Sequence, residues 1–433
     1  MNHLQLFLPC AAGVEEMLRS EVAAITQRAP QDVRQQRGGV SLEATWRDAQ
    51  CLNLHSRLAQ RVLVQLFHAP YRNEQDLYRA ASEVAWEIWF TPRQSIKVEV
   101  TAQHSPLTSL NFAALKIKDA VCDRFRAKAG GVRPDVDTQW PDVRIHAHLT
   151  TDEVFIYIDT SGEALFKRGW REDKGEAPLK ETLAAALIAA SGWTGDSGQP
   201  LYDPCCGSGT IAIEAAQIAC NIAPGILRHF AFEKMLPFQA HVWEGIRAQA
   251  QSAQRPPGPA VTVFGSDVAH RMVDFAQRNA QRAGVAAAIE FRGGDALQRL
   301  PPSATPGVML VNPPYGERIA AAGFAGTAHA RRAAPAQGDA GADDHSVGRE
   351  AAQVDGGGEF FALLAAHWKK HYAGWTAWVL TPDLKLPGKM RLKESRRVPM
   401  WNGPIECRLF RFDMVPGSAR RATAGANTKL TGA

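Results

Sequence analysis

The chain has 433 residues, and its 49 lysines and arginines exceed its 44 aspartates and glutamates by a formal net charge of only +5. This length allows two or three domains with cores of their own, while the small charge excess does not by itself indicate a nucleic-acid partner. No stretch reaches the roughly 18 apolar residues that a membrane-spanning helix needs, so we expect a soluble protein with no membrane partner.

The cysteines and histidines suggest neither disulfides nor a metal centre. Seven cysteines include no C-x-x-C pair, and Cys205 and Cys206 are adjacent. This pattern fits a reducing compartment and predicts neither a disulfide framework nor a zinc site. His146 and His148 alternate along a strand-like stretch without a third ligand, so no metal is predicted. The N-terminus lacks the pattern of a secretory leader, and we expect a cytoplasmic protein.

The first 160 residues read as two mixed units of helices and strands. Residues 1–45 give strand, helix and strand in the segments LQLFLP, GVEEMLRSEVAAI and GGVSLEA. Residues 46–160 continue with WRDAQCLNLHSRLAQ (helix), RVLVQLFHAP (strand), EQDLYRAASEV (helix), SIKVEVTA (strand) and FAALKIKDAVCDRFRAKAGG (helix). The segments VRIHAHLT and EVFIYIDTSG then alternate at period two and predict a hairpin. We expect a compact mixed sheet with helices on one side.

Two local concentrations of positive charge occur, at residues 116–133 and 385–397. Either could follow the phosphates of RNA, and a solvated helix face explains each almost as well. The candidates for RNA contact in the first of them are Lys116, Lys118, Arg124, Arg126 and Lys128.

From residue 161 the pattern changes to alternating helices and strands, which is typical of an open parallel sheet. We assign residues 161–415 to this α/β domain, with strands at QPLYD, VTVFGSD, IEFRGGD, GVMLVN and GWTAWVLTP and with ECRLFRFDM closing an edge. Residues 321–358 are poor in large apolar side chains and predict a mobile insertion. The tail, residues 416–433, has the same character and is predicted to be disordered.

A glycine turn follows the first strand of this domain, in LYDPCCGSGTIAIEAA at residues 201–216. Gly207, Gly209 and Ala212 fit the pattern G-x-G-x-x-[GA], in which glycines allow a ligand to approach the backbone at a helix N-terminus. Alone, this pattern fits NAD, another nucleotide or tight strand–helix packing. Asp267 ends the next strand and could bind ribose hydroxyls, although its separation from Gly207 requires an insertion at residues 217–260.

Polar residues also end the other strands of this domain. Asp203 ends the first strand, just before the glycine turn. Asp295 follows the third strand and could accept a hydrogen bond from the amine of an adenine. Because ligands bind at the carboxyl edge of a parallel sheet, we expect the three aspartates to form one crevice. The fourth strand ends in VNPPYGERIA, residues 311–320.

That last stretch suits the methylation of an exocyclic amine. The side-chain oxygen of Asn312 and the carbonyl of Pro313 could accept the two N–H bonds of the amine and aim its lone pair at an electrophile. Pro313 and Pro314 would stiffen the turn, and Tyr315 could stack on a base swung out of its helix or loop. A proline-rich turn with a packed tyrosine is the alternative interpretation.

The segments DPCCGSGT, NPPYGERI and NGPIECRLFRF resemble the catalytic domain of the S-adenosylmethionine-dependent, THUMP-containing guanine-N2 methyltransferases of large-subunit ribosomal RNA. The N-terminal segments NFAALKIKDAVCDRFR, DVRIHAHL and SGEALFKRGWREDKGEAPLKETLAAAL agree with it. The resemblance implies a ferredoxin-like segment at 1–45, a THUMP RNA-binding domain at 46–160 and a class I, Rossmann-like methyltransferase domain thereafter. It leaves out residues 321–358 and the tail.

The same resemblance implies roles for individual residues. Asp203, Gly207 and Gly209 would face the methionine part of S-adenosylmethionine, Asp267 its ribose and Asp295 its adenine. The target base would be held by Asn312, which is also counted with the cofactor-binding residues, and by Pro313, Pro314 and Tyr315. Cys205 departs from the family, which has an apolar residue there, and the insertion after Ile319 is unusual. The implied partner is 23S ribosomal RNA, free or in an assembling large subunit.

Other functions compete with this one. A tRNA guanine-N2 methyltransferase shares the THUMP domain, and a DNA adenine-N6 methyltransferase shares the Asn-Pro-Pro-Tyr chemistry. A non-catalytic RNA-binding assembly factor would not need Asn312 or the glycines, and a nicotinamide dehydrogenase offers no role for residues 312–315. Some relatives carry a second domain that makes 7-methylguanine, and one activity only is expected here.

Overall fold

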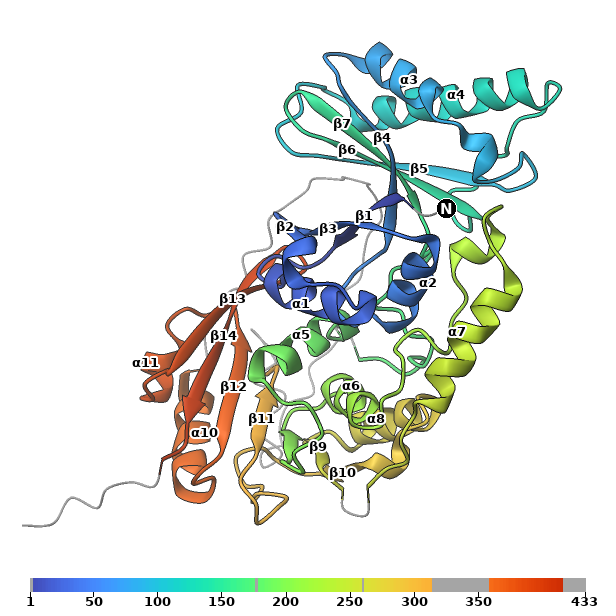
Figure 1. Ribbon diagram of the computed structural model, residues 1–433. Coiled ribbons are helices and arrows are strands. Elements are labelled where there is room, and N and C mark those ends of the chain that lie inside the picture. The colour runs from blue at the N-terminus through green and yellow to red at the C-terminus, as the bar shows by residue number, and fades with distance from the viewer. Residues whose placement is uncertain (1–2, 176–177, 259–260, 314–357, 416–433) are drawn as a thin grey trace, which may run out of the picture.

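The computed structural model describes residues 3–175, 178–258, 261–313 and 358–415, which fold around two seven-stranded sheets (Figure 1). The predicted residues Pro314 and Tyr315, most of the 321–358 insertion and the 416–433 tail lie outside the described residues. Within the described part, no helix has the length and apolar character needed to cross a membrane.

The first sheet has the order β2-β3-β1-β4-β7-β6-β5. Its strands are β1 (Leu4–Pro9), β2 (Arg34–Gln36), β3 (Gly39–Ala44), β4 (Leu63–Pro70), β5 (Ile96–Ala102), β6 (Val143–Leu149) and β7 (Glu153–Asp159). Its helices are α1 (Glu15–Thr26), α2 (Trp46–His55), α3 (Glu74–Glu83) and α4 (Leu110–Lys128), with 3-10 turns η1 (Pro30–Asp32) and η2 (Trp86–Ile88).

One continuous sheet joins the two predicted N-terminal units. Strand β1 pairs with β3 on one side and with β4 on the other, and Leu6 lies opposite Val64. Strands β6 and β7 form the predicted antiparallel hairpin, whereas β5 pairs with β6 in parallel. The sheet is therefore mixed, as expected. The boundary between the units at residue 45 stays a prediction.

Side-chain caps explain where two of these helices begin. Thr45 accepts a hydrogen bond from the backbone of Asp48, which binds the backbone of Thr45 in return, so that α2 starts at Trp46. Asn73 and Asp76 form the same reciprocal pair before α3. Such capping boxes satisfy backbone N–H groups that have no partner in the first helical turn.

The second sheet has the order β10-β9-β8-β11-β12-β14-β13. Its strands are β8 (Leu201–Asp203), β9 (Val263–Asp267), β10 (Ile289–Gly293), β11 (Val308–Val311), β12 (Thr376–Thr381), β13 (Arg396–Asn402) and β14 (Ile405–Asp413). Its helices are α5 (Glu181–Ser191), α6 (Thr210–Ala219), α7 (Ala240–Ser252), α8 (His270–Arg282), α10 (Gly358–His371) and α11 (Leu386–Met390), with η3 (Ala231–Lys234) and η4 (Ala286–Ala288). Strands β8 to β12 are parallel, and β14 is antiparallel to β12.

The prediction that ECRLFRFDM closes an edge of this sheet was wrong. That segment is β14, which lies between β12 and an additional strand, β13. Strand β13 overlaps the basic stretch at residues 385–397, where Arg396 and Arg397 are exposed. Exposed edge strands often carry charged side chains in place of alternating apolar and polar residues. Strand β13 therefore lacks the sequence pattern from which a strand is predicted.

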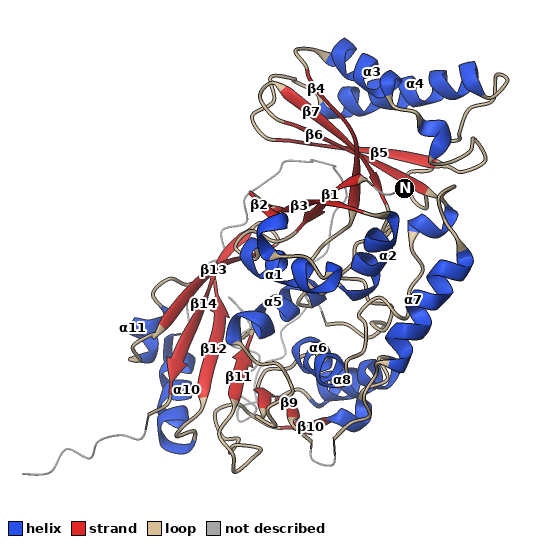
Figure 2. Cartoon of the chain, in the orientation of Figure 1, coloured by secondary structure: helices blue, strands red, loops and turns tan. Residues whose placement is uncertain are grey.

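Helices cover both faces of this sheet (Figure 2). Along β11, Val308 and Leu310 belong to the core cluster that includes α5 and α6, whereas Met309 and Val311 belong to the cluster that includes α10 and α11. Successive residues of a strand point to opposite faces, so this central strand is buried on both sides. Its carboxyl end lies with those of its parallel neighbours at one edge of the sheet.

A buried ionic cluster ties the two halves together. Glu214, in α6, accepts hydrogen bonds from Arg168 (Nε–Oε1, 3.0 Å) and from Arg57 (Nη1–Oε2, 3.4 Å). Arg57 follows α2 and also binds the carbonyl of Ile222. Because the acid is fully buried, removing Glu214 itself would take this carboxylate away from two guanidinium groups in the interior. The cluster therefore fixes α6 against the N-terminal half.

Candidate functional site

The glycine turn leads from β8 into α6 and is held by backbone hydrogen bonds. The amide of Cys206 donates to the carbonyl of Ser266 (2.8 Å), and the amide of Gly209 donates to the carbonyl of Cys206 (2.8 Å). The amide of Gly207 donates to the carboxylate of Asp267 (3.0 Å), which lies at the end of β9. The turn is thus built directly onto the neighbouring strand.

The two glycines of the turn have different roles. Gly209 has φ +88° at the N-cap of α6, and a Cβ there would lie 2.9 Å from the Cβ of Ala276 in α8. Gly207 has φ +53°, and a Cβ there would meet nothing nearer than a methionine methyl at 3.9 Å. Gly209 therefore serves close helix packing, while Gly207 supplies a left-handed turn at which a Cβ would make only an ordinary van der Waals contact.

The three predicted aspartates end successive strands and receive backbone hydrogen bonds. Asp203 is buried and accepts from the amide of Cys205 (3.1 Å). Asp267 accepts from the amide of Ala269 (2.9 Å) as well as from Gly207, and Asp295 accepts from the amide of Leu297 (2.9 Å). Each side chain is fixed within its own turn and retains lone pairs for a ligand.

The three acids act together on the thiol of Cys205. Burial raises the pKa of the Cys205 thiol well above its usual value, and the charges of Asp203, Asp267 and Asp295 raise it further. Burial, with a contribution from Asp267, raises the pKa of Asp203 to about 8. Burial also raises the pKa of Asp267. Three acids at one sheet edge, the candidate crevice, favour a ligand with a positive group and several hydrogen-bond donors.

Asn312 and Pro313 stand at the same edge. They follow β11, which pairs with β8 so that Met309 lies opposite Tyr202. Asn312 is half-buried and Pro313 is buried. The structure thus brings the amide and the first proline of the predicted base-binding turn to the sheet edge that carries the glycine turn.

Arg171 is a site residue that the sequence did not indicate. Its guanidinium donates to Ser208 Oγ (2.8 Å) and to Thr210 Oγ1 (2.8 Å), the residues on either side of Gly209. Its Nε is paired with Glu181 (2.7 Å) at the start of α5. Arg171 therefore links the glycine turn to the start of α5. No spacing rule links it to residues 208–210, and its basic surroundings, FKRGWREDKG, were the only available signal.

The five predicted RNA contacts lie elsewhere, on α4, which Figure 1 shows at the opposite end of the molecule from β9 and β10. Arg124 is committed to a two-point pair with Glu87 (2.7 and 2.8 Å) and to the carbonyl of Ser82. Lys116 lies over the ring of Phe112. Lys118 pairs with Asp119, and Arg126 pairs with Asp123. Lys128 is exposed. The structure does not bring these cations to the crevice.

Three domain families match the chain. They are described as the RlmL ferredoxin-like domain (residues 5–63), the THUMP domain (residues 71–159) and the RMKL-like methyltransferase domain (residues 168–328). The last of these ranges contains the glycine turn, the three aspartates and Asn312.

Curated relatives match along nearly the whole chain. The chain is 36% identical over 417 residues to a ribosomal RNA large subunit methyltransferase K/L of Psychromonas ingrahamii, which covers 95% of the chain and 50% of the relative. A protein of the same name from Shewanella pealeana is 34% identical over 432 residues, with 99% and 55% covered. The chain thus spans about half the length of the curated relatives it matches.

Solved structures share the whole fold. A putative methyltransferase, SMU.472, complexed with SAH matches with a TM-score of 0.77 at 25% identity, covering 95% of this chain and 98% of that one. A possible methylase from Clostridium difficile matches with a TM-score of 0.78 at 26% identity, covering 96% and 100%. The chain thus carries, in this order, segments that match the ferredoxin-like, THUMP and methyltransferase domain families.

Proposed function

We propose that the chain transfers a methyl group from S-adenosylmethionine to the exocyclic N2 amine of a guanine in large-subunit ribosomal RNA. The observation that carries this proposal is the sheet edge, where the glycine turn and three aspartates adjoin Asn312. The curated relatives are named as ribosomal RNA methyltransferases, which supports ribosomal RNA as the substrate, and the THUMP domain supports RNA over DNA. The seven free cysteines suit a cytoplasmic enzyme.

The residues of the crevice fit S-adenosylmethionine. Asp267 has a carboxylate at the end of β9, where ribose hydroxyls can donate to it. The left-handed turn at Gly207 lets a ligand approach the backbone at the start of α6. Asp203 is a buried acid suited to an ammonium group, and Asp295 is placed for the adenine. When bound, S-adenosylmethionine supplies a methyl group on a positively charged sulfur, which a neutral amine can attack.

Residues of the chain orient the target amine for attack on the methyl group. The nitrogen lone pair of a guanine amine is delocalised into the ring, which makes it a poor nucleophile. Asn312 Oδ1 and the Pro313 carbonyl accept its two N–H bonds and hold the nitrogen with its lone pair directed away from the ring plane. Tyr315, outside the described residues, would stack on the base. No general base is assigned, because the methylated amine can release its proton to water.

A substrate comparison tests the proposal. The protein is incubated with methyl-labelled S-adenosylmethionine and separately with ribosomal RNA, tRNA and DNA, and the modified nucleoside is identified after digestion. Label is expected in N2-methylguanosine from 23S RNA. Label found only in tRNA, or only in adenine, would replace this function with one of the alternatives considered for the sequence.

An Asp267→Ala variant is expected to weaken the binding of S-adenosylmethionine by about 1–3 kcal/mol, because ribose hydroxyls would lose a charged acceptor. The amides of Gly207 and Ala269 also lose their acceptor, so the free energy of unfolding should fall as well. Calorimetric titration and urea unfolding measure the two effects. Asp274→Ala, which removes an exposed carboxylate from α8, is the matched control and should change neither. Unchanged affinity in Asp267→Ala would remove this residue from the site.

A further inference from the structure

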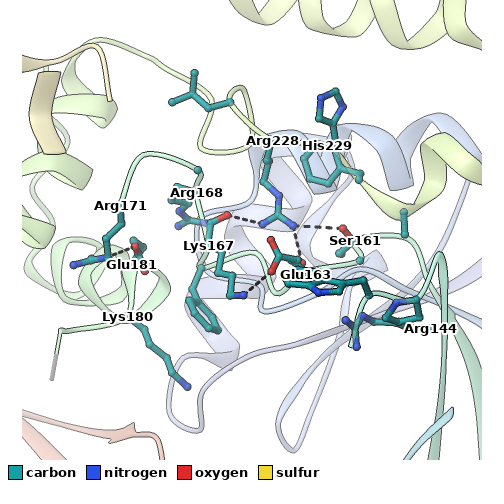
Figure 3. A pocket seen from close by; sticks show the side chains of 18 of the residues that line it. Arg144, Ser161, Glu163, Lys167, Arg168, Arg171, Lys180, Glu181, Arg228 and His229 are labelled. Carbon is teal, nitrogen blue, oxygen red and sulfur yellow. Dashed lines mark hydrogen bonds and ion pairs between the residues drawn. The ribbon is translucent and has the colours of Figure 1, made fainter. Parts of the chain in front are cut away.

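A second concave site lies outside the crevice. It is an open cavity of ≈ 900 Å³ between the first sheet and the methyltransferase domain (Figure 3). Three parts of the chain line it. Arg144 comes from β6, Lys167 and Lys180 come from the segment between β7 and α5, and Arg228 and His229 precede η3.

The lining of this cavity is strongly positive. It contains eight lysines and arginines against three carboxylates, an excess of five that equals the formal net charge of the whole chain. The cations are Arg144, Lys167, Arg168, Arg171, Lys174, Lys180, Arg228 and Lys234, and the acids are Asp142, Glu163 and Glu181. Arg168 and Arg144 are paired with Glu214 and Glu99, which lie outside the lining, and the remaining excess of three positive charges gives the hollow a field that attracts polyanions.

The cations divide into a buried set and an accessible set. Arg228 is buried and donates to the carbonyls of Glu163 (2.6 Å), Ala164 (2.9 Å) and Lys167 (3.0 Å), and among the described residues no carboxylate binds it directly. Lys167, Lys174 and Lys180 are exposed. The ion pair of Lys167 with Glu163 is solvated on both sides, and such pairs yield readily to a stronger anion.

Two aromatic rings accompany these lysines. Trp140, on the rim, is 74% exposed, which is unusual for so large an apolar side chain. Phe166 is half-buried, and the ammonium of Lys180 lies 5.1 Å from its ring centroid. Exposed rings among lysines are the combination that binds single-stranded nucleic acid, because bases stack on the rings while phosphates follow the charges.

We propose that this cavity binds a single-stranded segment of RNA, with phosphates on Lys167, Lys174 and Lys180 and a base stacked on Trp140. The inference rests on the proposed RNA substrate and names the surface that holds it. A duplex has its bases paired inside and offers no ring face to a single tryptophan, so the cavity selects an unpaired strand.

The cavity also adjoins the crevice. Arg171 lines the cavity and binds Ser208 and Thr210 of the glycine turn, and Glu181 joins the same network. Lys180 precedes Glu181 in the chain, and Glu181 and Arg171 connect this wall of the cavity to the turn that would hold the cofactor. RNA held between the THUMP domain and this wall stays attached while one of its bases enters the crevice.

The test uses the whole protein and a fluorescent twelve-residue oligouridylate, followed by anisotropy from 0.05 to 0.5 M salt. In the triple variant Lys167→Gln, Lys174→Gln, Lys180→Gln, the slope of log Kd against log salt concentration should fall by about two, since each phosphate contact on a single strand contributes roughly 0.7. The affinity at 0.1 M salt should then fall about 100-fold, because lines of different slope converge near 1 M salt.

Trp140→Ala should weaken the oligonucleotide about tenfold without altering the salt slope, which separates stacking from charge. The matched control, Lys369→Gln with Lys370→Gln, removes two exposed lysines from α10 and should behave as the parent. Unchanged binding in the triple variant, or equal competition by duplex RNA or by polyglutamate, would overturn the assignment.

Calorimetry with S-adenosylmethionine and methylation of ribosomal RNA keep this inference distinct from the proposed function. If the oligonucleotide binds through these lysines while no RNA is methylated, the function fails and the binding site stands. If RNA is methylated and the triple variant still binds as the parent does, the function stands and the binding site fails.

Discussion

An Asn312→Ala variant is expected to slow the chemical step of methyl transfer by about 100-fold or more, while S-adenosylmethionine still binds. The amide oxygen is proposed to accept an N–H bond of the target amine, and this bond matters most as the nitrogen approaches the transition state. Loss of one preorganised hydrogen-bonding group commonly costs this much in rate. Single-turnover methylation of ribosomal RNA by the variant measures the step directly.

Asn312→Asp is the matched control, since a carboxylate keeps an acceptor oxygen at the same place. It should retain more activity than the alanine variant, and calorimetry should find cofactor binding in both. An Asn312→Ala enzyme that methylates guanine at nearly the parental rate would show that the turn after β11 is only structural.

An Asp203→Asn variant is expected to be more stable than the parent protein at pH 8 and to bind the cofactor more weakly. In the folded protein the pKa of Asp203 is raised to about 8 from an ordinary value near 4, chiefly by burial. The neutral form is therefore favoured in the folded state. As the pH rises from about 4 to about 8, the parent loses stability, because the unfolded chain ionises this acid more easily.

The size of this effect follows from the same pKa. Each pKa unit corresponds to about 1.4 kcal/mol, so removal of the titrating group should gain several kcal/mol at pH 8 and little at pH 4. An asparagine keeps an oxygen for the Cys205 amide. Urea unfolding of the cofactor-free protein at both pH values measures the difference, and Asp274→Asn on the exposed face of α8 serves as the control. An equal gain at both pH values would contradict the raised pKa.

Cofactor binding should show the reverse dependence. A carboxylate at Asp203 favours the ammonium group of the cofactor, so the parent should release a proton on binding near pH 7 and gain affinity as the pH approaches 8. Calorimetry in two buffers of different ionisation enthalpy counts that proton. The asparagine variant should release fewer protons, and equal release by both proteins would assign the proton to another group.

The strands and the strand-end residues could be predicted because their signals are local. Alternation at period two in VRIHAHL and the apolar run before Asn312 predicted β6 and β11, and the glycine pattern predicted the turn before α6. Since the carboxyl ends of neighbouring parallel strands meet at one edge, their order along the chain sufficed to place the three aspartates together. The exposed edge strand β13 lacked such a pattern and was missed.

The sequence by itself thus determined the class of fold, the glycine turn and the row of acids that ends its strands. Tertiary structure alone decided which cations are available to a ligand. Arg124 forms an ion pair with Glu87, and Arg171 donates hydrogen bonds to the glycine turn. Exposed lysines and Trp140 line one cavity. These partners lie tens of residues apart, and pairing between distant side chains depends on how the sheets pack, which no local periodicity encodes.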